Sequence, residues 1–286
     1  MNKEMACQLR AYSFQNLPDK VRDFVTETLY SRQVEACYQI TSGLSNQNYL
    51  IVVEQSKYLL KQYQNDVPLP SLLFQRTISS TVCNVQKVIH WDEKSKVALF
   101  TYVDDVENDI EKHRLCDLVE TIAQVHQQSS EHLQCTLDLK QALMRLGSLF
   151  KQRFYSQWEF SSNSLNVYPK ELGCCHNDLV RENVISTKYG AVLIDFEYAA
   201  VGDIYFDLAG LVTSFQLGDE EVVWMLSIYY SCIGSEVPSY AIEKLCVYRM
   251  SYLLLCIAWY EERGEVEKAT SHTLQLKRLN ATKALR

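Results

Sequence analysis

The chain has 286 residues, of which 47% are hydrophobic and 22% charged, and its formal net charge is −7. A chain of this length can bury a large core, either as one domain or as two lobes, and its composition is ordinary for a globular protein. The acidic balance without a long Lys/Arg run argues against nucleic-acid binding. No apolar run reaches the roughly 18 residues that a membrane span needs, so we expect no membrane insertion.

The ten cysteines do not indicate disulfides. Cys37, Cys246 and Cys256 lie inside apolar runs, where a free cysteine behaves as a small buried hydrophobe. No pair has C-x-x-C spacing, which argues against a zinc ribbon. Residues 1–20 are polar and do not resemble a secretory signal. We therefore expect a cytoplasmic protein.

The first hundred residues predict one helix followed by an antiparallel sheet. Apolar residues at helical spacing predict an amphipathic helix over residues 17–29. From Val34 the apolar pattern changes to period two, which is typical of strands. A sheet of about five strands is expected, formed by residues 34–40, 49–53, 57–63, 84–91 and 97–103.

Beyond Val103 helical spacing dominates, and a single hairpin interrupts it. The predicted hairpin pairs residues 184–186 with 191–194 around a turn. Helices are expected near residues 115–125, 139–150, 219–233 and 240–263. The predicted fold class is α+β and bilobal, with an N-terminal β-rich lobe (1–103) and a mainly helical C-terminal lobe (104–286).

The most informative stretch is CCHNDLVRENVISTKYGAVLIDFEYA, residues 174–199. In the predicted hairpin, Asn183 and Asp195 come to the same end, as diagonal neighbours within side-chain reach. An amide oxygen and a carboxylate there suit Mg²⁺ holding a nucleotide phosphate. Asp178, on the loop before the hairpin, could then orient a hydroxyl group and accept its proton.

The spacing of these residues is that of protein-kinase-like phosphotransferases, H-x-D-x-x-x-x-N followed by D-F-x. His176, Asp178, Asn183 and Asp195 match all four positions together. The alternative interpretation is a solvated hairpin that carries scattered polar residues. Four matches at fixed spacing on a predicted hairpin favour the phosphotransferase interpretation.

The same run resembles the choline/ethanolamine kinases, a branch of the superfamily that includes aminoglycoside phosphotransferases and bacterial thiamine kinases. The segments CHNDL and IDFEYA look closer to the choline/ethanolamine branch, because aminoglycoside enzymes more usually carry glycine between the His and the Asp. The later segment GDIYFDLAGL also resembles the family. The resemblance implies a protein-kinase-like fold that uses ATP and Mg²⁺.

The resemblance also implies a role for each matched residue. Asp178 would be the catalytic base, and Asn183 and Asp195 would be the metal ligands. His176 would support the catalytic loop. Asp207 would brace that loop by accepting backbone N–H bonds, although an ordinary helix N-cap fits its sequence position equally well.

In the N-terminal lobe, a nucleotide-binding loop, a lysine and a hinge are expected. The segment SGLSNQNYL lies between two predicted strands and resembles the nucleotide loop of choline kinases; its candidate residues are Gly43, Leu44, Ser45 and Asn46. Lys61 is expected to face the phosphates from a strand. The hinge is expected near Tyr102 and Val103, whose backbone groups would bond the adenine.

One departure from the protein-kinase pattern concerns the partner of Lys61. Protein kinases pair this lysine with a helix glutamate, but the segment LPSLLFQRTIS that follows the strand contains no acid. Gln75 stands near the expected position. Either Gln75 supplies a neutral hydrogen bond, or another acid takes the role.

The acceptor site is expected among aromatic and acidic residues. Tyr252 and Trp259 share a predicted helix face, Glu262 lies near its end, and Trp224 lies on the preceding helix. Glu197 could add negative charge to the same pocket. Such a site attracts cations, at about 0.5–2 kcal/mol per ring. The alternative for each aromatic residue is an ordinary core position.

Three hypotheses on function remain open. The first is an ATP-dependent kinase for a small cationic alcohol, choline or ethanolamine foremost. The second is the same chemistry on thiamine or an aminoglycoside. The third is a catalytically silent kinase-like domain that binds a nucleotide or a partner. The sequence does not decide between a monomer and a homodimer.

Overall fold

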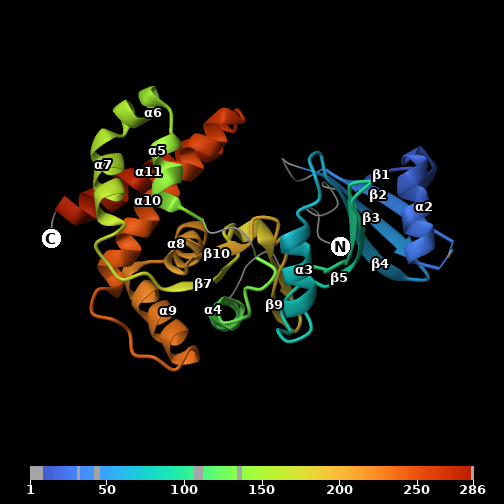
Figure 1. Ribbon diagram of the computed structural model, residues 1–286, viewed down its shortest axis with the longest axis horizontal. Coiled ribbons are helices and arrows are strands. Elements are labelled where there is room, and N and C mark those ends of the chain that lie inside the picture. The colour runs from blue at the N-terminus through green and yellow to red at the C-terminus, as the bar shows by residue number, and fades with distance from the viewer. Residues whose placement is uncertain (1–8, 31–32, 42–45, 106–111, 134–136, 285–286) are drawn as a thin grey trace. The chain divides into compact units, whose positions relative to one another are not determined.

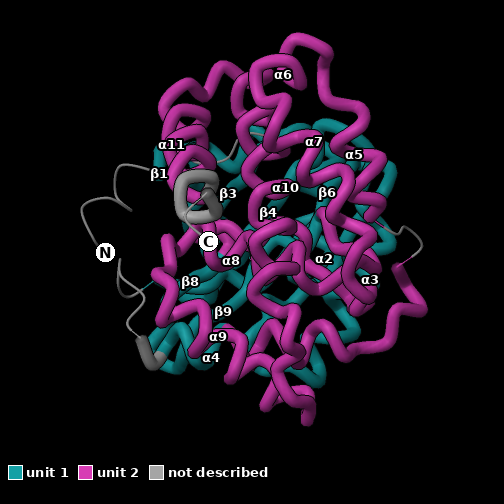
Figure 2. Tube along the Cα trace, turned by 90° about the vertical axis from the view of Figure 1, so that its left-hand side faces the viewer, with its two compact units in different colours: residues 1–118, 184–197 teal, residues 119–183, 198–286 magenta. Residues whose placement is uncertain are grey.

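The structure, a computed structural model, describes residues 9–30, 33–41, 46–105, 112–133 and 137–284. Its contacts divide the chain into two compact units, which Figure 2 colours separately. Unit 1 comprises residues 1–118 and 184–197, and unit 2 comprises residues 119–183 and 198–286. The division into functional lobes at residue 103 is a boundary of a different kind and stays a prediction.

Unit 1 is built on an antiparallel sheet of six strands in the order β1-β2-β3-β4-β6-β5 (Figure 1). The strands are β1 (Leu9–Ala11), β2 (Ala36–Ile40), β3 (Gln47–Val53), β4 (Ser56–Gln62), β5 (Val88–Asp92) and β6 (Val97–Thr101). The predicted antiparallel sheet is confirmed. Edge strand β1 was not predicted, because its three residues, LRA, are too short for an alternating pattern.

Two helices cover the two faces of this sheet (Figure 1). On one face, α2 (Asp19–Thr28) packs Val21 and Val25 into a cluster with Ile51 of β3 and other buried strand residues. On the other face, α3 (Leu69–Ile78) contributes Leu72 to a second cluster. Short helix η1 (Phe14–Asn16) precedes α2. The amphipathic pattern of residues 17–29 therefore predicted α2 correctly.

The predicted hairpin is also confirmed, as β8 (Val184–Thr187) paired with β9 (Gly190–Leu193). Leu193 lies beside the segment that precedes β5. Its N–H donates to the Asn84 carbonyl, and its own carbonyl accepts from the Gln86 N–H, both at 2.9 Å. These bonds make the hairpin part of unit 1, although most of its sequence neighbours belong to unit 2.

Unit 2 is mainly helical and is organised around α10 (Ala241–Glu262), which packs against four other helices, α5, α7, α8 and α11. The helices other than α10 are α4 (Lys112–His126), which begins in unit 1, α5 (Leu139–Arg145), α6 (Ser148–Arg153), α7 (Tyr155–Ser164), α8 (Tyr205–Ser214), α9 (Asp219–Cys232), α11 (Val266–Ala284) and the short η2 (Arg181–Asn183). Strands β7 (Leu172–Cys175) and β10 (Ala200–Asp203) form a separate antiparallel pair.

The prediction of one helix over residues 139–150 is wrong. The helix is interrupted between α5 and α6, where Leu146 and Gly147 adopt extended ψ angles of 143° and 150°. An apolar residue every three or four positions continues across this break, so the spacing alone did not reveal it. None of the helices in the described residues combines the length and apolarity of a bilayer-crossing segment.

Candidate active site

The loop that carries His176 and Asp178 begins where β7 ends. Strand β10 holds β7 in place, with Ala200 opposite Cys175. Glycine is required at position 173, because a Cβ atom there would lie 2.9 Å from the carbonyl oxygen of His126. The start of the loop is therefore fixed by packing of β7 against both β10 and the end of α4.

Asp207 holds the loop by its backbone. Its Oδ2 accepts the N–H of His176 at 2.6 Å, and its Oδ1 accepts the N–H of Asn177 at 2.7 Å. The residue is 2% exposed and lies in the first turn of α8, whose N-cap position is Ile204. These contacts have the geometry of the bracing role rather than that of a helix N-cap.

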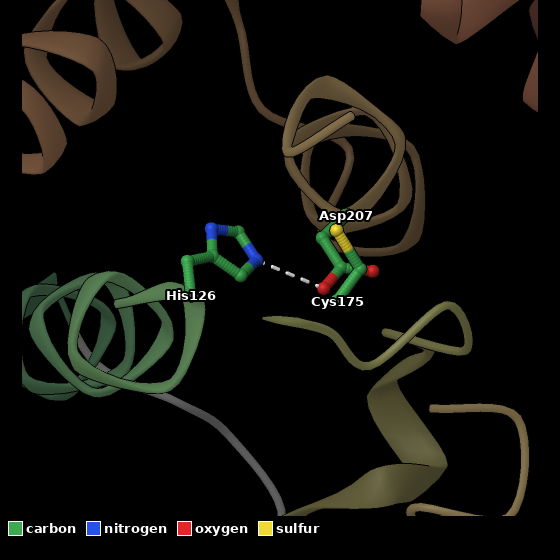
Figure 3. A group of neighbouring side chains, drawn as sticks. All are labelled: His126, Cys175 and Asp207. Carbon is green, nitrogen blue, oxygen red and sulfur yellow. Dashed lines mark hydrogen bonds and ion pairs between the residues drawn. The ribbon is translucent and has the colours of Figure 1, made fainter. Parts of the chain in front are cut away.

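The buried His126 contacts the Asp207 carboxylate (Figure 3). His126 Nε2 lies 3.0 Å from Asp207 Oδ2, and His126 Nδ1 lies 2.8 Å from the Tyr229 hydroxyl. Cys175 completes the cluster, and burial raises the pKa of its thiol. Both ring nitrogens of His126 and both oxygens of Asp207 have hydrogen-bond partners, as expected of a cluster that supports the loop. Sequence reasoning missed His126, because 81 residues separate it from Asp207.

Asp178 and Asn183 are brought together within unit 2. The Asn183 amide nitrogen donates to the Asp178 carbonyl at 2.9 Å and to Asp178 Oδ2 at 2.8 Å. The Asp178 N–H donates to His176 Nδ1 at 3.3 Å. Because the Asn183 nitrogen is committed to Asp178, its amide oxygen is the atom that could coordinate a metal.

Asn177, between His176 and Asp178, adopts a left-handed backbone with φ of 63°. Glycine and asparagine adopt this conformation more easily than other residues. The structure therefore gives a physical reason why asparagine here and glycine in aminoglycoside enzymes can occupy the same place in the loop.

In unit 1, Lys61 lies on the central strand β4 and pairs with both acids of the D-F-E segment. Its Nζ is 2.6 Å from Asp195 Oδ1 and 2.9 Å from Glu197 Oε2. Burial alone would lower the pKa of Lys61, but the charges of Asp195 and Glu197 outweigh it and raise that pKa. Lys61 is therefore held as a buried cation by two carboxylates.

The residues expected to hold Mg²⁺ have suitable chemistry. Both offer oxygen atoms, the ligands this ion prefers. The Asp195 side chain is 33% exposed and accepts a hydrogen bond from Lys61 at Oδ1, which leaves Oδ2 as an oxygen that could coordinate a metal. Asp195 belongs to unit 1 and Asn183 to unit 2, and their joint binding of one ion stays a prediction.

Gln75 does not contact Lys61 through its amide. The side chain is 2% exposed, and its Nε2 donates to the Gln86 carbonyl at 2.9 Å. The acid beside Lys61 that is additional to Asp195 is Glu197, which the sequence analysis assigned to the acceptor pocket. That assignment stays a prediction, but the Glu197 carboxylate is already engaged within unit 1.

Part of the expected nucleotide site lies among the described residues. The Asn46 amide donates to Glu197 Oε2 at 2.8 Å. At the expected hinge, the Tyr102 N–H donates to the Lys57 carbonyl at 3.2 Å, so an adenine contact would use other backbone groups near Val103. The remaining loop candidates, Gly43, Leu44 and Ser45, lie outside the described residues.

The aromatic residues expected at the acceptor site have different environments. Tyr252 is 4% exposed, and its ring packs edge-on against Phe206 at 5.4 Å. Trp259 is half-buried, and the Arg263 guanidinium lies 3.8 Å from its ring centroid. The other two candidates are the half-buried Trp224 on α9 and the exposed Glu262 at the end of α10.

Tyr260 and Glu182 are additional candidate residues in unit 2 that sequence reasoning did not name. Burial raises the pKa of Tyr260, and acidic neighbours that include Glu182 and Asp178 raise it further. Lys268 bridges this pair, with its Nζ 5.5 Å from the Tyr260 ring centroid and 3.4 Å from Glu182 Oε1. The signal in the sequence is the i, i+4, i+8 spacing of Tyr252, Cys256 and Tyr260, which places Tyr260 on the helix face of Tyr252.

A sheet unit with a buried lysine paired to the aspartate of a D-F-E segment, and a helical unit with a braced His-x-Asp loop, are the parts of a protein-kinase-like phosphotransferase. The chain belongs to the phosphotransferase enzyme family, whose sequence pattern matches residues 37–236. This family assignment agrees with the spacing of the residues described above.

Comparison with curated proteins gives a partial match to protein LicA of Haemophilus influenzae. The two are 29% identical over 114 residues, which cover 38% of this chain and 42% of that protein. The match therefore spans less than half the length of this curated relative.

Comparison with solved structures shows the same fold along most of the chain. Choline kinase LicA from Streptococcus pneumoniae has a TM-score of 0.74 at 19% identity, with 92% of this chain and 100% of that chain covered. A choline/ethanolamine kinase family protein from Mesorhizobium loti has a TM-score of 0.67 at 14% identity, covering 91% and 94% of the two chains. The GDP and kanamycin complex of APH(2")-IIia has a TM-score of 0.65 at 12% identity, covering 91% and 98%. The fold is the protein-kinase-like fold that the sequence predicted.

Proposed function

We propose that this phosphotransferase transfers the γ-phosphoryl group of ATP to the hydroxyl of a small cationic alcohol, with choline and ethanolamine foremost. Support for choline comes from the LicA relatives and the choline kinase structures. Support for a nucleotide comes from a neighbouring structure solved as a complex of LicA with AMP.

In this proposal each matched residue has one task. Asp178 orients the acceptor hydroxyl and takes up its proton late in a loose transition state. Lys61 neutralises phosphate oxygens, and backbone groups near Tyr102 and Val103 bind the adenine. Asn183 and Asp195 hold Mg²⁺, which when bound would offset the negative charge of the phosphates.

The observation that supports a cationic substrate is the pairing of Glu182 and Tyr260 around an ammonium group in unit 2. The Lys268 ammonium group lies 3.4 Å from Glu182 Oε1 and 5.5 Å from the Tyr260 ring centroid, and the charges of Glu182 and Asp178 both raise the pKa of Tyr260. A carboxylate beside an aromatic face is the combination that recognises ammonium groups. The Lys268 side chain is 43% exposed, so solvent is available to it when a substrate cation takes its place.

An ATP-consumption screen with choline, ethanolamine, thiamine and kanamycin tests the proposal. Turnover with choline or ethanolamine is the expected result. Preference for thiamine or kanamycin would keep the chemistry and replace the substrate class. No turnover with any acceptor, together with retained nucleotide binding, would identify a catalytically silent kinase-like domain.

Two substitutions then locate the cation. Tyr260→Ala is expected to raise KM for the alcohol about tenfold, the energy of one cation–π contact, while KM for ATP stays the same. Trp259→Ala is the comparison, because Trp259 belongs to the cation-binding wall predicted from the sequence. A tenfold effect at Trp259 with none at Tyr260 would place the cation on the wall predicted from the sequence.

A further inference from the structure

The residue that replaces the helix glutamate of protein kinases can be identified within unit 1. Lys61 has a side chain only 7% exposed, and a buried ammonium group requires acidic partners. Asp195 is one partner, but in the proposed function it is also a ligand of Mg²⁺. A second acid is therefore needed to hold Lys61 while Asp195 binds the metal.

We infer that Glu197 positions Lys61 for the nucleotide, an inference that rests on the proposed kinase function. Its Oε2 lies 2.9 Å from Lys61 Nζ, and its side chain is only 14% exposed. The same oxygen accepts the Asn46 amide at 2.8 Å. One carboxylate oxygen thus connects the lysine to the residue that ends the expected nucleotide loop.

Helix α3 supports this arrangement without supplying the acid. The Ser71 hydroxyl donates to the Glu197 carbonyl at 3.3 Å. The Phe74 ring packs against Phe196, with centroids 6.3 Å apart. In protein kinases the corresponding helix carries the glutamate. Here α3 instead holds the D-F-E segment, through the backbone carbonyl of Glu197 and the ring of Phe196.

Gln75 stands where the helix acid was expected, and it has a different task. Its amide donates to the Gln86 carbonyl, and the Gln86 amide in turn donates to the Thr101 carbonyl at 2.8 Å. This chain of bonds ties α3 to the strands, and it leaves the charge of Lys61 to the carboxylates.

A double-mutant cycle between Glu197 and Lys61 tests the inference. Glu197→Gln is expected to lower kcat about 10–100-fold, as misplacement of a catalytic group does, with KM for the alcohol unchanged. In a Lys61→Met background the same substitution should change kcat by no more than about twofold, because a positioning residue acts only through its partner. Glu197→Asp, which keeps the charge, should recover part of the loss.

Gln75→Met is the matched control in the same unit. It removes the bond to the Gln86 carbonyl, so the melting temperature should fall while kcat stays within about twofold. A control that loses as much kcat as Glu197→Gln would overturn the inference. Three other results would also overturn it: equal effects of Glu197→Gln with and without Lys61, recovery of kcat at high Mg²⁺, or a rise in KM for the alcohol alone.

The same double-mutant cycle can be measured by ADP binding in the presence of EDTA. This experiment requires no metal, no acceptor and no turnover. The effects of Glu197→Gln and Lys61→Met on the dissociation constant should again be non-additive. A wild type that binds no ADP would refute the proposed function itself. Wild-type binding with additive variants would refute only the inference on Glu197.

Discussion

Replacement of Asp207 by asparagine keeps the size of the side chain but removes the negative charge that holds the His-x-Asp loop. Asp207 accepts the N–H groups of His176 and Asn177 and the Nε2 of His126, all within 3.0 Å. Asparagine has one accepting oxygen and one donating NH₂ group. At least one of the three N–H groups that now faces a carboxylate oxygen would therefore face the NH₂ group of asparagine, which cannot accept its hydrogen bond.

The size of the effect follows from these contacts. A hydrogen bond to a charged group contributes about 1.5–3 kcal/mol, and a buried N–H left without an acceptor costs about 1–3 kcal/mol. Asp207 is 2% exposed, so water cannot replace the lost bond. We expect Asp207→Asn to lower the free energy of unfolding by about 2–5 kcal/mol, and kcat by about 10–100-fold because Asp178 is no longer held in place.

Thermal unfolding and steady-state kinetics measure the two effects separately. Thr213→Val on the same helix is the matched control. The Thr213 side chain is fully buried, and within the described residues its hydroxyl has no hydrogen-bond partner, so valine should leave both stability and kcat nearly unchanged. An Asp207→Asn variant with the melting temperature and kcat of the wild type would refute the bracing role.

Four further predictions concern other buried or strained groups. Lys244→Met leaves the nearly buried Asp203 carboxylate and the partly exposed Glu171 carboxylate without their cation, so denaturant titration should show a loss of about 3 kcal/mol. Burial lowers the pKa of His272 below 6.5, so the neutral imidazole is favoured in the folded state. Its contribution to stability is therefore present above pH 6.5 and is lost as the pH falls. The melting temperature of His272→Gln should decline less on acidification than that of the wild type. Asn177→Gly should retain most of kcat, whereas Asn177→Val should lose stability, because valine disfavours the left-handed backbone. Burial raises the pKa of Cys256 to about 12, so mass spectrometry after iodoacetamide treatment should find exposed Cys83 modified well before Cys256.

Local patterns explain why much of the fold could be predicted from the sequence. Helix α2 and hairpin β8–β9 depend on contiguous apolar periodicity, which is visible in any short window. Helix α11 was missed because, among its residues whose burial is described, only Ala269 and Leu276 are buried. A mostly polar surface helix has little amphipathic signal, and its packing against α10 decides its formation.

The same distinction applies to the candidate site. His176, Asp178 and Asn183 lie within eight consecutive residues, so their spacing alone marked them. Asp195 is 134 residues from Lys61, and each was found through its own local motif. The pairing of Lys61 with Glu197 could not be found in this way. Nothing in the strand KYLLKQ specifies which distant acid lies opposite, since only the tertiary fold brings the D-F-E segment beside β4.

The two units hold their functional groups by different physical means, and this difference determines how each should respond to substitution. In unit 2 the Asp207 carboxylate binds backbone N–H groups, so its loss changes the path of the chain itself. In unit 1 the Glu197 carboxylate binds the side chains of Lys61 and Asn46, so its loss leaves the backbone of β4 in its ladder with β3 and β6. Stability and kcat should therefore fall together at Asp207 and separately at Glu197. A variant of Glu197 that unfolded as readily as one of Asp207 would show that the D-F-E segment, and not β4, is the weaker part of unit 1.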